Sequence, residues 1–187
     1  DLVYLTNQNT ISYHIWTARL PDLERPDRLA LDLELHAAVG LATLSELPAR
    51  VARRNEMVRV FAAATAGLPG IRIPAVNTGD VSTYKDLTLV VDEQDFGLDV
   101  PALRTVLDAE GVDTRRYFHP PVHRQRAYAY LGTPPPLPVT DELSPRVLTV
   151  PLWNHMTDET VRGLADLVIR CHESAGAISA AVAGASG

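Results

Sequence analysis

The stretch TRRYFHPPVHRQRAY, residues 114–128, is the part of the sequence from which the fold is best read. Its aromatic pair favours a short strand, because aromatic side chains pack well on a pleated surface. Pro120 and Pro121 end that strand, since proline has no N–H to donate to a helix or a sheet. We therefore expect His123, Arg124 and Arg126 on a stiff loop, where polar side chains often bind ligands. A solvated basic turn stays open as an alternative.

The composition bounds the class of protein. A chain of 187 residues with 46% hydrophobic and 21% charged residues is typical of one globular domain with a small addition. The net charge of -6 argues against a nucleic-acid partner, because phosphate binding needs clustered Lys and Arg. The single cysteine, Cys171, excludes an internal disulfide and a cysteine metal cluster, and it fits a cytoplasmic location. No apolar run has the length of a membrane span.

Two further features concern the start of the chain and its lysine content. The chain begins at Asp1 without a Met or a signal-like segment, which we interpret as a piece or a processed product. Lys85 is the only lysine. Any mechanism that needs a Schiff-base lysine therefore has one candidate, and its strand-like surroundings favour an exposed structural lysine instead.

The first 34 residues have a β-type pattern. Residues 2–6 and 11–17 predict two strands joined by a polar turn, which together indicate a hairpin. Residues 29–33 predict a third strand. On a strand, Asp32 and Glu34 would point to the same side, where two carboxylates can bind a divalent metal. Solvated acids at a strand end are the alternative interpretation.

This opening segment, residues 1–34, resembles the primase-polymerase module of bacterial end-joining ligase D. The matching residues are Asn7-Gln8-Asn9, His14-Ile15-Trp16, Arg19, Pro26-Asp27 and Asp32-Leu33-Glu34. The resemblance implies a nucleotide site with a divalent metal at Asp32 and Glu34. The sequence departs from that pattern at Glu34, which stands where the family has its second Asp.

The rest of the chain alternates helical and strand-like patterns. The expected helices cover residues 35–44, 48–66, 100–110, 140–143 and 158–172, and the expected strands cover residues 71–76, 82–92 and 146–152. The arginines of the second helix are expected on a solvated face, and the tail at 175–187 is expected to fray. This order predicts an α+β fold with a small, mixed or antiparallel sheet packed with helices.

Residues 35–174 resemble the C-terminal small domain of the DegT/DnrJ/StrS sugar aminotransferases. Seven blocks carry the resemblance in order: ELHAAVGLATL (34–44), ARRNE (52–56), STYKDLTLVVD (82–92), TRRYFHPPVHRQRAY (114–128), LPVTDEL (137–143), VLTVPLW (147–153) and MTDETV (156–161). The resemblance implies the small domain of a dimeric fold-type I aminotransferase that uses pyridoxal phosphate (PLP). Such an enzyme moves an amino group onto a keto-sugar nucleotide.

The same resemblance assigns roles to residues. It places the loop with Tyr117, His123 and Arg124 near the substrate entrance, which makes these three residues candidates for substrate binding. It also places the PLP lysine upstream of residue 34, in a large domain, so Lys85 is not expected to hold the cofactor. We therefore expect no catalytic residue in this chain and no PLP bound by it alone.

Three hypotheses about function follow. The first is a sugar-aminotransferase small domain that is not catalytic by itself and that needs a large domain or forms a homodimer. The second is a remnant of a metal-dependent nucleotidyl transferase, and the third is a non-catalytic dimerisation module. Because the two resemblances meet at residues 32–35, we also put forward the hypothesis that the chain is a fusion of two unrelated segments.

Overall fold

A computed structural model describes the backbone of residues 2–6, 11–15, 27–133 and 135–185, and the side chains of residues 38–133, 135–182 and 184. The chain divides into two compact units, Asp1–Ala52 and Arg53–Gly187. Each unit is considered by itself below. None of the described helices is both long and apolar enough to cross a membrane.

The first unit contains a β-hairpin. Strand β1 (Leu2–Thr6) pairs antiparallel with β2 (Ile11–Ile15), with Leu2 opposite Ile15. This confirms the predicted hairpin, although its turn at residues 7–10 lies outside the described residues. The pairing follows from two β-branched and aromatic runs of equal length.

The third predicted strand, at residues 29–33, is wrong. Those residues belong to helix α1 (Asp27–Ala64), because leucine and alanine dominate the run and have high helix propensity. In a helix, residues two apart point in nearly opposite directions, since each residue turns by about 100°. Asp32 and Glu34 thus lose the geometric argument for a shared metal. Their side chains lie outside the described part of the chain, so the metal site stays a prediction without that support.

Helix α1 also replaces the two helices that the sequence predicts on either side of Pro48. The proline lies inside the helix. One proline removes a single backbone hydrogen bond, and long helical runs on both sides maintain the rest. The hydroxyls of Thr43 and Ser45 donate to the carbonyls of Val39 and Ala42, at 2.7 and 2.8 Å, in the turns before the proline.

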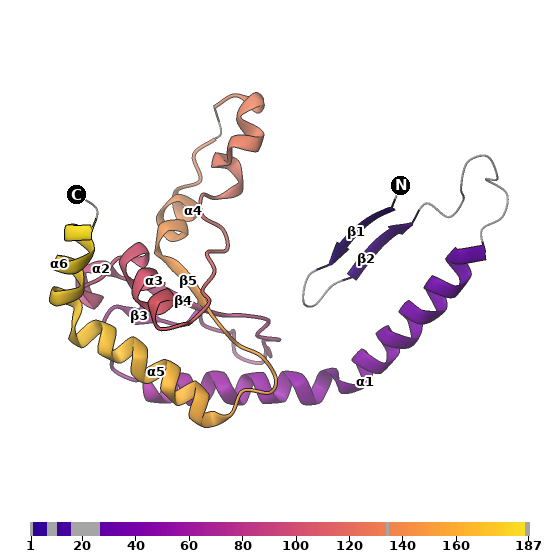
Figure 1. The fold of residues 1–187 in the computed structure, drawn as a ribbon, viewed down its shortest axis with the longest axis horizontal. Helices are drawn as coiled ribbons and strands as arrows, with labels where there is room; N and C mark the ends of the chain where they lie inside the picture. The colour runs from indigo at the N-terminus through magenta and orange to yellow at the C-terminus, as the bar shows by residue number, and fades with distance from the viewer. Residues whose placement is uncertain (1, 7–10, 16–26, 134, 186–187) are drawn as a thin grey trace. The chain divides into compact units, whose positions relative to one another are not determined.

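The second unit is built on a three-stranded antiparallel sheet with the order β3-β4-β5, as Figure 1 shows. The strands are β3 (Ile71–Arg72), β4 (Leu87–Val91) and β5 (Val147–Val150). Leu87 pairs with Val150 and Ile71 with Val91. The sheet confirms the predicted α+β class, with strands shorter than the sequence pattern predicts.

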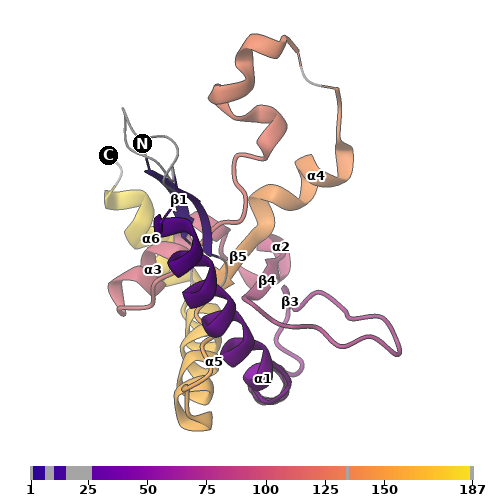
Figure 2. The same ribbon diagram turned by 90° about the vertical axis from the view of Figure 1, so that its right-hand side faces the viewer.

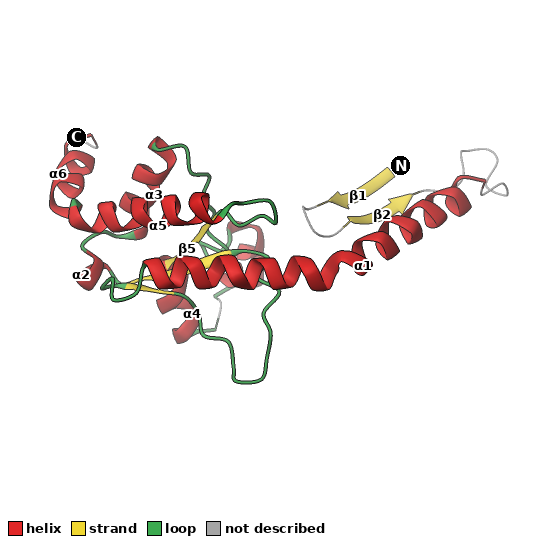
Figure 3. Ribbon diagram, turned by 90° about the horizontal axis from the view of Figure 1, so that it is seen from below, coloured by secondary structure: helices red, strands yellow, loops and turns green. Residues whose placement is uncertain are grey.

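Helices pack against this sheet (Figure 3). They are the C-terminal part of α1, α2 (Glu93–Phe96), α3 (Val100–Ala109) and α5 (Asp158–Glu173). Their shared apolar core contains Met57, Phe61, Leu87, Leu89, Phe96, Leu103, Leu107, Leu148 and Val168. Asp99 and Thr157 cap α3 and α5 by accepting from backbone N–H groups at 2.7 and 3.1 Å, as predicted.

The arginines of α1 correct another prediction. Arg50 and Arg59 are exposed as expected, but Arg53 and Arg54 are not on a solvated face. Arg53 donates to the carbonyl of Met156 at 2.6 Å, and Arg54 donates to the Asn154 amide oxygen at 2.9 Å. Charged side chains that bind backbone and side-chain oxygens across elements fix one segment to another.

The C-terminal tail also differs from the prediction, because it forms helix α6 (Ala175–Ala185). Ile178 and Val182 are partly buried against the core. An alanine-rich sequence has high helix propensity, and burial of two branched side chains adds tertiary support. The expected fraying is therefore wrong through residue 185.

Residues 117–143, here called the lobe, project from the second unit (Figures 1 and 2). The lobe contains the short helices η1 (Val122–Arg124), η2 (Arg126–Leu131) and α4 (Pro138–Leu143), followed by η3 (Ser144–Arg146). The strand predicted at the start of residues 114–128, just before the lobe, is reduced to one bridge between Arg115 and Thr149. Because Pro120 and Pro121 follow so closely, the pairing with β5 does not extend beyond this bridge.

Candidate functional site

An apolar groove of about 670 Å³ lies within the lobe. Its lining residues are Phe118, Pro121, Val122, His123, Tyr128, Leu131, Gly132, Thr133, Pro135, Leu137 and Thr140. They come from the segment before η1, from η1 and η2, from the connection between η2 and α4, and from α4. A concave, mostly apolar surface with a few polar groups is typical of a small-molecule site.

His123 and Arg124, both predicted as site residues, contact the same carboxylate, that of Asp141. The sequence alone did not single out this acid. Arg124 donates to both carboxylate oxygens of Asp141, at 2.6 Å from Nε and 2.8 Å from Nη2. His123 Nε2 lies 3.1 Å from the Oδ1 of Asp141. Arg124, helped by His123, lowers the pKa of Asp141 to about 2. The acid is thus ionised at neutral pH.

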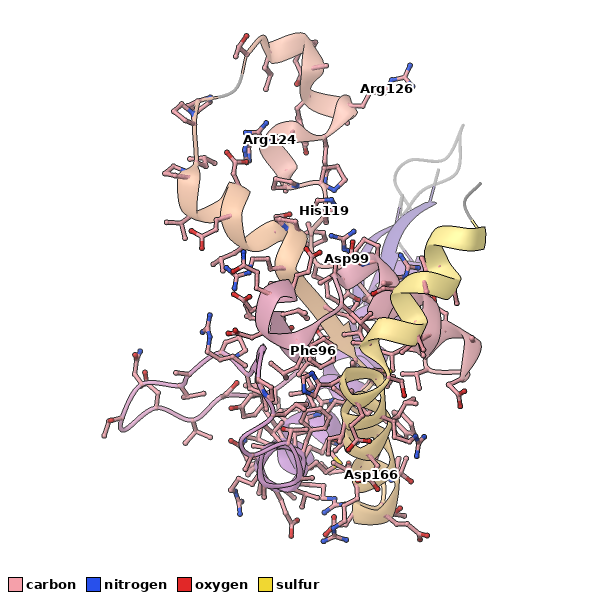
Figure 4. All side chains as sticks on the ribbon, turned by 90° about the vertical axis from the view of Figure 1, so that its left-hand side faces the viewer. Phe96, Asp99, His119, Arg124, Arg126 and Asp166 are labelled. Atoms are coloured by element: carbon pink, nitrogen blue, oxygen red, sulfur yellow. The ribbon has the colours of Figure 1, made fainter. Side chains whose placement is uncertain are left out.

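Arg126, a further basic residue of the stretch, behaves differently. Its side chain is exposed and points away from the lobe (Figure 4). The same view places Arg124 within the lobe and His119 at its base. The basic cluster of the sequence is therefore split, with only His123 and Arg124 brought together.

The base of the lobe is closed by a polar chain. The Ser144 hydroxyl donates to the carbonyl oxygen of Phe118 at 2.7 Å, and His119 Nδ1 lies 3.1 Å from the same hydroxyl. Burial, together with the nearby Arg116, lowers the pKa of His119.

Tyr117 lies beside the groove and does not line it. Its ring meets that of Phe118 edge-on at 5.5 Å between centroids, and Phe118 is a lining residue. The Nζ of Lys85 lies 5.5 Å from the centre of the Tyr117 ring, within the range of a cation–π contact. The structure thus connects the only lysine with the lobe, which the sequence alone did not predict.

Comparison with known proteins identifies the group to which this fold belongs. The sequence model of the DegT/DnrJ/EryC1/StrS aminotransferase family matches residues 31–168. The chain belongs to this family. The match includes the lobe, the groove and the whole sheet, and it starts inside the segment that resembles ligase D. That second resemblance and the fusion stay predictions.

Two kinds of relative support the assignment. The dTDP-3-amino-3,4,6-trideoxy-alpha-D-glucose transaminase of Streptomyces venezuelae is 32% identical over 126 residues, which cover 66% of this chain and 31% of the relative. The crystal structure of DesI in the presence of its TDP-sugar product has a TM-score of 0.71 at 31% identity, covering 77% of this chain and 36% of DesI.

A further structural neighbour is S. venezuelae DesV in complex with a ketimine intermediate. It has a TM-score of 0.66 at 29% identity. The alignment covers 75% of this chain and 36% of DesV. The chain thus spans about a third of the length of these relatives. The comparison confirms the family and the fold class, while the activity of the longer proteins remains a property of those proteins.

The family is PLP-dependent, and the described residues do not fit a PLP site. A PLP enzyme holds its cofactor through a lysine. Lys85 is 46% exposed, pairs with Asp86 at 3.5 Å and lies over Tyr117. It does not line the groove. Among the residues whose side chains are described, there is also no cluster of three or more His, Cys, Asp or Glu that could hold a metal.

Proposed function

We propose that this chain is the small domain of a PLP-dependent transaminase that acts on keto-sugar nucleotides, and that the lobe receives the sugar end of the substrate. The groove in the lobe is the observation that supports this proposal most directly. Its volume of about 670 Å³ lies in the range of small-molecule sites and leaves room for a hexose ring, and its walls are apolar apart from a histidine, a tyrosine and two threonines.

The proposed roles of the predicted residues differ from one another. His123 lines the groove and is 13% exposed, so it can contact a bound sugar directly. Tyr117 supports the wall through Phe118. Arg124 acts through Asp141, because both carboxylate oxygens already accept from its guanidinium. All three residues belong to the substrate side of the site, and none carries out the chemistry.

PLP supplies the electron sink for amino transfer in this family. Because Lys85 does not fit that role, we propose that the cofactor is held by residues other than those described. If PLP is added to this chain, wild type and Lys85→Ala should give the same absorbance spectrum. A band that only the wild type shows would contradict this part of the proposal.

We also propose that the lobe contacts a protein partner, either a large domain or a second copy in a homodimer. Large apolar side chains are concentrated there: Tyr130 is 80% exposed and Leu131 is 69% exposed, and Val139 is exposed as well. A contiguous patch of exposed apolar residues is typical of an interaction surface, whereas single scattered ones are not.

Calorimetric titration tests the sugar-binding proposal. Wild type should bind a TDP-linked hexose more tightly than TDP alone. His123→Ala should remove that difference. His155→Ala is the matched control, because His155 is an exposed histidine outside the groove. Equal affinities of wild type for TDP and for the TDP-linked hexose would contradict the proposal.

A further inference from the structure

Asp141 is the point where the polar groups of the lobe converge. It lies on α4 and accepts from Arg124 Nε at 2.6 Å, while His123 Nε2 is 3.1 Å from the same Oδ1 oxygen. Its second oxygen accepts from Arg124 Nη2 at 2.8 Å. The Asp141 side chain is 25% exposed, so the pairs are partly shielded from water.

This arrangement determines which nitrogen of His123 carries a proton. An ionised carboxylate can only accept hydrogen bonds. His123 Nε2 therefore has to be the donor to Asp141, and the neutral imidazole has its proton on Nε2. In that tautomer Nδ1 is an unprotonated acceptor. Within the described residues, no hydrogen bond to Nδ1 is recorded.

The same carboxylate forms a bidentate ion pair with Arg124. A bidentate pair uses the two edge donors, Nε and Nη2, that a guanidinium would otherwise present to a phosphate. The Nη1 group and one N–H of Nη2 stay outside this pair. Arg124 is not among the residues that line the groove, and no Arg or Lys lines it within the described part of the chain.

We infer that Asp141 is a positioning residue that fixes the Nε2–H tautomer of His123, so that the groove offers the Nδ1 acceptor to a ligand hydroxyl. The ligand part of this inference rests on the proposed sugar-binding function. It identifies the occupant of the groove as a neutral hydroxylated ring with an apolar face, because no Arg or Lys among the lining residues could pair with a diphosphate.

Long-range proton–nitrogen NMR of the full chain tests the tautomer. At about pH 9, where histidine is neutral, His123 of wild type should show the Nε2–H form, assigned by its loss in His123→Gln. Asp141→Ala should give a mixture of tautomers, and Arg124→Gln should keep the wild-type form because the acceptor is still present. A predominant Nδ1–H form in wild type would overturn the inference.

Binding of two probes tests the consequence for the ligand. In Asp141→Ala, His123 is no longer held in the Nε2–H form, so affinity for a TDP-linked hexose should fall about threefold, as expected for one weakened hydrogen bond, while affinity for TDP stays the same. The preference for a TDP-linked hexose over TDP should fall. A structural role alone would lower both affinities together, and that parallel loss would overturn the inference.

The two readouts separate the inference from the proposed function. The tautomer is measured without any ligand, so it reports on Asp141 directly. If wild type has the Nε2–H form but shows no preference for the TDP-linked hexose over TDP, the sugar-binding proposal fails while the positioning role of Asp141 stands. If the tautomer is wrong, the positioning role fails whatever the probes show.

Discussion

The core and the lobe of the second unit are stabilised in different ways. In the core, large side chains such as Phe61, Leu89 and Leu103 are 0% exposed, and helices cover the sheet. In the lobe, none of the residues of η1, η2 or α4 is buried. Its elements are joined by the contacts of Asp141 with His123 and Arg124.

This difference separates the scaffold from the part that selects a ligand. Apolar burial is not directional, so the core tolerates exchange of one apolar side chain for another, but it does not tolerate a change in side-chain volume. Hydrogen-bonded pairs are directional and place individual atoms, as a binding site requires. The lobe thus has the properties of a recognition element on a rigid support.

The largest expected effect comes from truncating the core. Phe61→Ala should destabilise the second unit by about 4 kcal/mol, because it removes a fully buried ring and leaves a cavity. Tyr130→Ala in the lobe should change stability by less than about 0.5 kcal/mol, since that side chain is 80% exposed. Urea unfolding followed by circular dichroism measures both. Similar losses in the two variants would remove the distinction between core and lobe.

A glycine at the edge of the core gives the next largest effect. Gly70 has φ of 72°, and a Cβ there would lie 2.2 Å from the backbone nitrogen of Phe96. We expect Gly70→Ala to cost about 3 kcal/mol, from the left-handed backbone and the clash. Gly79→Ala, at φ of 92° with open space, should cost about 1 kcal/mol. Equal midpoints in urea for the two variants would show that the close approach to Phe96 is not tight.

The N-cap of α3 should have a smaller effect. Asp99→Ala removes the acceptor for the Ala102 N–H and should cost about 1 kcal/mol. Asp166 is an exposed acid on α5, and Asp166→Ala is the matched control, with an expected change below about 0.5 kcal/mol. Thermal unfolding of both variants is sufficient. A cap variant as stable as the control would mean that water replaces the cap.

The smallest effect on overall stability concerns the lobe and depends on pH. The pKa of Asp141 is lowered to about 2, chiefly by Arg124. A carboxyl with a lowered pKa contributes stability above its ordinary value near 4, and that contribution is lost as pH falls through about 2. Carboxyl-carbon NMR should give a midpoint near 2 in wild type and a higher one in Arg124→Gln. A midpoint that Arg124→Gln leaves unchanged would contradict the ion pair.

The sequence predicts the core well because its signals are local. Strand runs at Leu87–Val91 and Val147–Val150 and the caps at Asp99 and Thr157 are short patterns that act within a few residues. The errors have two causes. The strand predicted at residues 29–33 is helical because the helix propensity of leucine and alanine outweighs the alternating pattern. Helix α6 forms where fraying was expected because Ile178 packs against the core.

The candidate site was only half predictable for the same reason. His123 and Arg124 stand out in the sequence because they follow a proline pair. Asp141 follows them by 17 or more residues, and no spacing rule connects it to them. The one available signal was the acid at the start of the predicted helix near residue 140, which is more often a helix-dipole partner than a site residue.

The most direct test of the account is to map where a sugar nucleotide binds. In amide and side-chain NMR of wild type, a TDP-linked hexose should shift the signals of His123, Phe118 and Leu131, which line the groove. TDP alone should leave them unchanged. Equal shifts with both ligands, or shifts confined to residues outside the lobe, would contradict the claim that the groove of the lobe receives the sugar.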